Sequence, residues 1–272
     1  MQSLRASFVL VAAFAWSGVL LPFALLSRCL VLLGAQRLSL RLGARVQGLW
    51  ARGMLALLRV RVEVEGSIPR GPFLVAANHL SYVDIFVLAS LLPVRFVAKS
   101  EIAGWPVIGV LARSVGTLFV PQAARRELPG VARAMRATLA ARTSLVLFPE
   151  ARAHRGREIQ RCHSALFEPA VREALPCLPV ALSYVTDAEP FGPAWTVCWW
   201  GGMDLPRHVW RLLLVGGRGP IRARVRVGNE LLRSGDRKQL AARTQACLEE
   251  LFVPVAQEPA PPDLPWTQLL EL

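Results

Sequence analysis

Hydrophobic and polar positions divide the chain into a long apolar start, a series of short alternating elements and a proline-rich end. Residues 6–27 contain no charged side chain, and a helix of that length can cross a hydrocarbon core of about 30 Å. Pro22 interrupts this segment, so a kinked helix or a helical hairpin continuing through residues 29–36 is also open. The segment therefore predicts a membrane anchor that spans or enters the bilayer, with a buried core helix as the alternative.

The next segment, residues 37–58, spaces arginines regularly among apolar residues. This pattern is typical of an amphipathic helix at a membrane interface, although a surface helix of the main domain can share it. Basic residues are more frequent after the apolar segment than before it: Arg5 precedes it, and Arg28, Arg37, Arg41, Arg45 and Arg52 follow it. Because positive charge marks the cytoplasmic side of a membrane segment, we expect the chain after residue 28 to lie in the cytoplasm.

Short strand-like and helix-like stretches alternate through the rest of the chain. Strands are predicted at 60–66, 73–77, 95–98, 117–120, 145–148, 177–184, 195–200 and 221–228. Helices are predicted at 85–92, 105–113, 128–142, 164–174, 204–214 and 236–252. Such alternation favours a single α/β domain with a mostly parallel central sheet flanked by helices. We place this domain at 59–252, between the N-terminal membrane and interfacial helices (1–58) and a proline-rich C-terminal tail (253–272).

The composition strengthens the membrane interpretation. The 272 residues are 53% hydrophobic and carry a formal net charge of +13, nearly all of it from arginine, because Lys99 and Lys238 are the only lysines. A basic protein is drawn to phospholipid headgroups or to nucleic acid. The apolar content and the lack of a nucleic-acid-binding module favour lipid. Five scattered cysteines without a C-x-x-C pair indicate reduced thiols and a cytosol-facing protein, not a disulfide framework or a zinc site.

Polar residues that could carry chemistry follow the apolar run at 73–77, in the sequence FLVAANHLSYVD. Asn78 and His79 come where this predicted strand ends, and open α/β folds place their sites at that edge of the sheet. Asn78 or Ser81 could cap the helix that follows, and Asp84 comes five residues after His79. A histidine base held by a carboxylate suits the deprotonation of an alcohol that attacks an ester or thioester. The alternative is a histidine satisfied by a local hydrogen bond.

The stretch NHLSYVD resembles the N-H-x-S-x-x-D box of the glycerolipid acyltransferases, and three further boxes follow in the family order. Residues 116–122 are similar to the G-x-x-F-V-x-R box, 145–156 to the F-P-E-G-T box, and 177–184 to the strand with its V/L-x-P-V box. Segments 163–171 and 199–213 are similar to bacterial members, including relatives that acylate lyso-ornithine lipid. The ordered boxes identify the chain as a member of the bacterial branch of this family.

The resemblance implies transfer of an acyl chain from acyl-carrier protein or coenzyme A to the hydroxyl of a lysolipid, above all 1-acylglycerol-3-phosphate. It implies no metal or other cofactor, and a place at the bacterial inner membrane with the site facing the cytoplasm. His79 is then the general base and Asp84 its partner, with Asn78 and Ser81 in the same box. The family positions that bind substrate in the other boxes correspond to Gly116, Phe119, Glu150 and Pro179.

Two boxes depart from the family pattern and leave the acceptor open. Gln122 stands where the family has an arginine that contacts phosphate, and Arg125 and Arg126 could supply this charge from a shifted loop. Ala151 and Arg152 replace the glycine and threonine of the third box. Arg152 could grip a phosphate through two hydrogen bonds or could be a solvated arginine. Lyso-ornithine lipid is therefore a second candidate acceptor, and a catalytically silent membrane-binding protein is the alternative of a different class.

The remaining histidines have structural interpretations. His154, Cys162 and His163 are close in sequence, but arginines surround them and no further ligand has a fitting spacing, so we expect no metal. We expect His208 to be structural. The tryptophans that could line an acyl groove are expected in the core instead: Trp195, Trp199, Trp200 and Trp210.

Overall fold

The computed structural model describes residues 2–105, 108–120, 128–187 and 191–259, and its centre is a seven-stranded sheet. The strand order is β1-β7-β6-β2-β5-β3-β4, and every neighbouring pair is parallel except β6 and β7. This mostly parallel sheet confirms the predicted fold class. The strands are β1 (Val60–Glu65), β2 (Leu74–Ala77), β3 (Val94–Lys99), β4 (Leu118–Val120), β5 (Ser144–Leu147), β6 (Cys177–Thr186) and β7 (Ile221–Val227).

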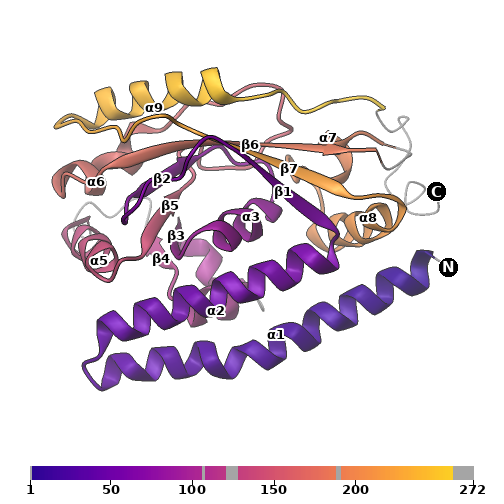
Figure 1. Cartoon of the computed structure of the whole chain (residues 1–272), viewed down its shortest axis with the longest axis horizontal. Helices are drawn as coiled ribbons and strands as arrows, with labels where there is room; N and C mark the ends of the chain where they lie inside the picture. The colour runs from indigo at the N-terminus through magenta and orange to yellow at the C-terminus, as the bar shows by residue number, and fades with distance from the viewer. Residues whose placement is uncertain (1, 106–107, 121–127, 188–190, 260–272) are drawn as a thin grey trace.

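Helices form most connections between the strands and the whole N-terminal region (Figure 1). Two of them begin at aspartates that cap the first turn: Asp204 accepts the N–H of Arg207 at 3.0 Å, and Asp236 accepts that of Gln239 at 2.8 Å. The α-helices are α1 (Gln2–Leu32), α2 (Gln36–Leu57), α3 (Val83–Leu91), α4 (Ile108–Ser114), α5 (Leu128–Ala140), α6 (Glu168–Arg172), α7 (Pro193–Thr196), α8 (Leu205–Arg218) and α9 (Arg237–Leu251). Short 3₁₀ helices lie at Ser100–Gly104 and Ser164–Phe167.

The segment 195–200 is not the predicted strand. Pro193 starts the short helix α7, where its fixed φ suits a first turn, and the N–H of Val197 donates to its carbonyl at 2.9 Å. Trp195 and Trp200 then lie against the guanidinium of Arg155, which is 4.9 Å and 4.8 Å from the two ring centroids. Side-chain packing in a loop, not strand pairing, accounts for the apolar run.

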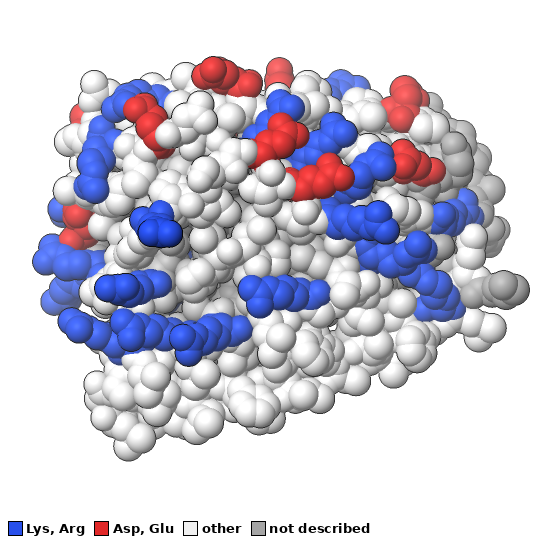
Figure 2. All heavy atoms as spheres, in the orientation of Figure 1, with Lys and Arg blue, Asp and Glu red and all other residues white. Residues whose placement is uncertain are grey.

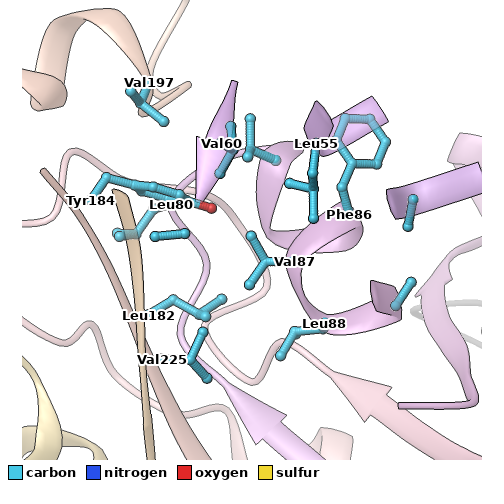
Figure 3. Packing of buried hydrophobic residues seen from close by; sticks show 14 of the residues in the cluster. Leu55, Val60, Leu80, Phe86, Val87, Leu88, Leu182, Tyr184, Val197 and Val225 are labelled. Atoms are coloured by element: carbon cyan, nitrogen blue, oxygen red, sulfur yellow. The ribbon is translucent and has the colours of Figure 1, made fainter. Parts of the chain in front are cut away.

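Helices cover both faces of the sheet, and alternate residues of the central strands enter two separate cores. Val75 and Ala77 of β2 belong to the core that contains residues of α1, α2, α3 and α8, part of which is seen in Figure 3. Leu74 and Ala76 belong to the core that contains residues of α5 and α9. A parallel strand buried on both faces reads as a continuous apolar run, which explains the pattern at 73–77.

The first two helices form an antiparallel hairpin along one side of the molecule (Figure 1). α1 continues through Pro22 without a break, and the chain reverses at residues 33–35 instead. Within the described part of the chain, α1 is the one helix long and apolar enough to cross a membrane. One side of α1 packs on the protein, while large apolar side chains are exposed on the other: Leu4, Phe8, Val11, Phe14, Val19, Phe23 and Leu26.

Candidate active site

The chain leaves β2 at the carboxyl edge of the sheet, and the neighbouring strand β6 fixes the segment that follows. β6 runs parallel to β2, with Ala77 opposite Val180, and continues as far as Thr186. The side chain of Asn78 extends this ladder: Nδ2 donates to the carbonyl of Leu182 at 3.0 Å, and Oδ1 accepts the N–H of Leu182 at 2.6 Å. Asn78 therefore anchors the loop and does not cap α3, so that predicted alternative is wrong.

His79 and Asp84 lie as close together as their spacing predicts. His79 Nδ1 is 2.8 Å from Asp84 Oδ2; the Asp84 side chain is fully buried, and 19% of the His79 side chain is exposed. Because an ionised carboxylate can only accept a hydrogen bond, Nδ1 carries the proton and Nε2 is the basic nitrogen. The pair therefore has the geometry of a general base with its orienting group.

The buried Asp84 carboxylate accepts three hydrogen bonds besides that of the histidine. Oδ2 accepts the N–H groups of Leu80 at 2.7 Å and Ser81 at 2.9 Å, and Oδ1 accepts the hydroxyl of Tyr184 at 2.5 Å. Burial and the nearby Asp84 charge raise the pKa of Tyr184, so its hydroxyl stays protonated and donates. These donors offset the cost of burying the charge. Ser81 Oγ accepts the N–H of Val83 at 3.3 Å, at the start of α3.

An aromatic stack supports the imidazole of His79. Its ring lies 4.1 Å from that of Phe148, centroid to centroid, with an interplanar angle of 18°, and Phe148 stacks in turn on Phe96 at 6.2 Å. Phe148 directly follows β5, and Phe96 lies in β3, the next strand of the sheet. The stack and the bond to Asp84 together fix the plane of the ring.

Glu150 joins the loop after β5 to the loop after β2. Its buried carboxylate accepts the N–H of His79 at 2.7 Å through Oε2 and that of Gln160 at 2.7 Å through Oε1. His154 Nε2 lies 3.0 Å from both oxygens, and its Nδ1 accepts the N–H of Gly156 at 3.2 Å, so Nε2 carries the proton. The N–H of His154 also donates to the carbonyl of His79 at 3.1 Å. One loop therefore bonds both backbone groups of His79.

The remaining predicted substrate residues are more dispersed. Pro179 is buried in β6 opposite Ala76, next to the strand that leads to His79. Gly116 precedes β4 and Phe119 lies within it. β4 is the edge strand, three strands away from β2 in the sheet. Arg152 is exposed, two residues after Glu150. Gln122 of the altered second box, and Arg125 and Arg126 that follow the box, lie outside the described part of the chain.

Two residues that bond the buried carboxylates of the site through their side chains were not predicted as site residues from the sequence: Tyr184 and His154. Tyr184 is the polar end of the apolar run at 177–184, which is a weak signal for a buried hydrogen-bond donor. His154 comes four residues after Glu150 but stands among arginines that obscure it. Among the described residues, no group of three His, Cys, Asp or Glu side chains is placed to hold a metal ion.

Ala151 adopts a backbone conformation that favours glycine, with a φ of +62°. A non-glycine residue in this left-handed region costs about 1–2 kcal/mol, partly offset by the lower entropy of the unfolded chain. We expect Ala151→Gly to raise the free energy of unfolding by about 0.5–1 kcal/mol in urea titrations. The matched change Ala153→Gly, at a residue without positive φ, is expected to lower it by a similar amount. A loss of stability in both variants would contradict this account of Ala151.

The fold and the site define an α/β protein whose parallel sheet presents a histidine–aspartate pair at its carboxyl edge. The Acyltransferase family model matches residues 59–183. The lyso-ornithine lipid O-acyltransferase of Brucella abortus is 32% identical over 212 residues, which cover 72% of this chain and 78% of that protein. The chain belongs to the acyltransferase family, and its histidine–aspartate pair and third box fall within the matched region.

A second relative and a solved structure extend the comparison. The 1-acyl-sn-glycerol-3-phosphate acyltransferase of Neisseria meningitidis is 36% identical over 166 residues, 60% of this chain; the chain spans only 63% of the length of that relative. The crystal structure of the 1-acyl-sn-glycerophosphate acyltransferase of Thermotoga maritima has a TM-score of 0.56 and 19% identity, and the match covers 92% of this chain and 98% of that one. That structure shares the fold of this chain.

Proposed function

We propose that this protein transfers an acyl chain from a thioester to the free hydroxyl of a lysolipid, in phospholipid biosynthesis. The observation that carries the proposal is the bond from His79 Nδ1 to Asp84 at 2.8 Å, which leaves Nε2 as a base in a partly exposed ring. A silent membrane-binding scaffold would gain nothing from a buried carboxylate, whose desolvation costs stability. The intact pair therefore favours the enzyme.

In the proposed reaction, His79 Nε2 removes the proton of the acceptor hydroxyl while the hydroxyl oxygen attacks the thioester carbonyl carbon. A C–O bond forms, and Asp84 stabilises the imidazolium that results. The tetrahedral intermediate then expels the thiolate as the C–S bond breaks, and His79 returns its proton to the sulfur. The donor would be acyl-carrier protein or coenzyme A carrying the acyl group, and the step needs no metal or other cofactor because histidine supplies the proton transfers.

The proposed acceptor is 1-acylglycerol-3-phosphate, so the product is phosphatidic acid. Glu150 would order the acceptor end of the site through its bond to the His79 backbone. Arg152, which is exposed and two residues away in sequence, would bind the phosphate of the acceptor. Arg125 and Arg126, which follow β4 in sequence, are the other candidates for this charge. Gly116 and Phe119 would contact the acceptor from the side of β4.

Lyso-ornithine lipid is the second candidate acceptor. It is favoured by the relatives of that name, one of which shares 78% of its length with this chain, and by Gln122 in place of the phosphate-binding arginine. The test is acyl transfer by the purified protein to a panel of lysolipids that differ only in headgroup, with each donor in turn. We expect ester formation on 1-acylglycerol-3-phosphate. A clear preference for lyso-ornithine lipid would favour the second candidate, and no product from any lysolipid would contradict the enzyme.

We further propose that α1 lies in one leaflet at the cytoplasmic face of the bacterial inner membrane. Both ends of α1 adjoin the main domain: near its start Gln2 Oε1 accepts from Arg218 Nε at 3.2 Å and Arg5 donates to Leu213 O at 3.4 Å, and α2 follows its end. A spanning α1 would separate its start from α8. In Figure 2 the lower edge, where Figure 1 places α1, is uncharged, and a row of basic side chains lies directly above it. Such a border suits anionic headgroups.

This location predicts that the start of α1 is accessible only from the cytoplasm. We expect Ser3→Cys, in a background with Cys29→Ser and Cys247→Ser, to react with a membrane-impermeant thiol reagent in inverted membrane vesicles and not in intact spheroplasts. Val64→Cys, on exposed β1, serves as the matched cytoplasmic control. Labelling of Ser3→Cys in spheroplasts while Val64→Cys stays unlabelled would show that α1 spans the membrane.

A further inference from the structure

The segment 253–259, here called the strap, crosses the loop that follows β5. It contains no helix or strand, yet Val255 is only 2% exposed, and its N–H donates to the carbonyl of Gly156 at 2.8 Å. Gly156 lies so close to the strap that a Cβ there would be 2.7 Å from Val255 Cγ2 and 3.4 Å from Leu80 Cδ2. The beginning of the predicted tail is therefore packed as part of the core.

Gln257 supplies the polar contacts of the strap. Its Oε1 accepts from Arg155 Nε at 2.8 Å, and its Nε2 donates to the carbonyl of Arg155 at 3.2 Å. The carbonyl of Gln257 accepts the indole N–H of Trp195 at 2.8 Å, and the same indole lies against the Arg155 guanidinium. One glutamine thus bonds both the backbone and the side chain of Arg155.

The residues held by the strap adjoin those that hold the catalytic histidine. Arg155 and Gly156 directly follow His154, which bonds the Glu150 carboxylate through its ring and the His79 carbonyl through its N–H. Glu150 in turn accepts the N–H of His79. Gln257 therefore bonds Arg155, and the preceding residue in the chain, His154, bonds Glu150 and His79. Through this loop the strap is connected to both backbone groups of His79.

We propose that the strap positions His79 for proton transfer, with Gln257 as a positioning residue that acts through Arg155 and His154. The inference rests on the proposed function, since it concerns the same base. Residues 253–259 were predicted from the sequence as the start of a proline-rich tail, and the proposal gives them a role in supporting the active site instead. Without the strap, Arg155 loses its partner for both backbone and side chain, and the loop can shift away from His79.

The kinetic test compares Gln257→Ala with Gln239→Ala, a glutamine exposed at the start of α9. A small displacement of a catalytic group costs rate, so we expect Gln257→Ala to lower kcat about ten- to a hundredfold with KM nearly unchanged. Gln239→Ala should match the wild type. His154→Gln should also lower kcat, and the double variant should be little worse than the more severe single one, because both act through one loop. A wild-type kcat for Gln257→Ala, or fully multiplicative losses, would overturn the proposal.

Hydrogen exchange supplies a readout that does not depend on activity. We expect Gln257→Ala to speed amide exchange in peptides covering 73–84 and 150–160, where the N–H groups of His79 and His154 are bonded, and Gln239→Ala to leave it unchanged. Unchanged exchange in both peptides would overturn the role of the strap. A wild-type protein inactive on every lysolipid would instead contradict the proposed function, while the exchange rates would still decide whether the strap holds His79.

Discussion

Replacing His79 with asparagine is expected to lower kcat for acyl transfer about 10²–10⁴-fold, the usual contribution of a general base, and to change KM for the lysolipid little. The asparagine amide can still donate to Asp84 Oδ2 from the position of Nδ1, but it offers no basic nitrogen in place of Nε2. The substitution therefore removes the base and keeps its anchor. Steady-state kinetics with 1-acylglycerol-3-phosphate and a thioester donor measure the effect.

The matched control is His163→Asn, because His163 is an exposed histidine outside the hydrogen-bonded pair. It should retain wild-type kcat. Loss of the stacking on Phe148 should cost the His79 variant about 0.5–1.5 kcal/mol of stability, too little to unfold it, and circular dichroism can check this. Activity of His79→Asn within a few-fold of wild type would show that another group takes the proton.

The central part of the site was predictable because its signals are local. The apolar run at 73–77 ends at Asn78, and an α/β sheet places such ends at one edge, next to the end of β5 and Glu150. The five-residue spacing of His79 and Asp84 lets the first turn of α3 return the carboxylate to the imidazole. The end of the apolar run fixes where the strand stops, and the start of α3 fixes where Asp84 lies relative to His79. Both can be read from residues 73–84 alone.

The supporting contacts were not predictable, because they join residues far apart in sequence. Asn78 bonds Leu182, and Asp84 bonds Tyr184, only because β6 lies beside β2 and continues past its end. The sequence shows an apolar strand at 177–184 but not its neighbour. The same holds for Gln257, whose partner Arg155 is 102 residues away. The prolines around Val255 predict a segment without helix or strand, and the structure confirms this. They do not indicate that the Val255 side chain is buried.

Replacing Asp84 with asparagine is expected to lower kcat/KM about 10²–10⁴-fold, because it removes the charge that stabilises the imidazolium. The shape of the residue is kept. With its Oδ1 in the place of Oδ2, the asparagine can still accept from His79, Leu80 and Ser81. The kcat/KM values of the two proteins over a range of pH measure the loss. The matched control is Asp187→Asn, the same exchange at an exposed aspartate that pairs with Arg222, and it should leave kcat/KM unchanged.

In Asp84→Asn, the amide of the new asparagine would then face the Tyr184 hydroxyl, which in the wild type donates to Asp84 Oδ1 at 2.5 Å. An N–H group cannot accept this proton, so the buried hydroxyl must turn and leave its own proton unpaired, at a cost of about 1–3 kcal/mol. We therefore expect Tyr184→Phe to destabilise the wild type but to be nearly neutral, or stabilising, in the Asp84→Asn background. Urea unfolding of the four proteins gives the coupling free energy. If the two substitutions prove additive in stability, Tyr184 does not donate to Asp84, and the carboxylate that orients His79 is held by backbone groups alone.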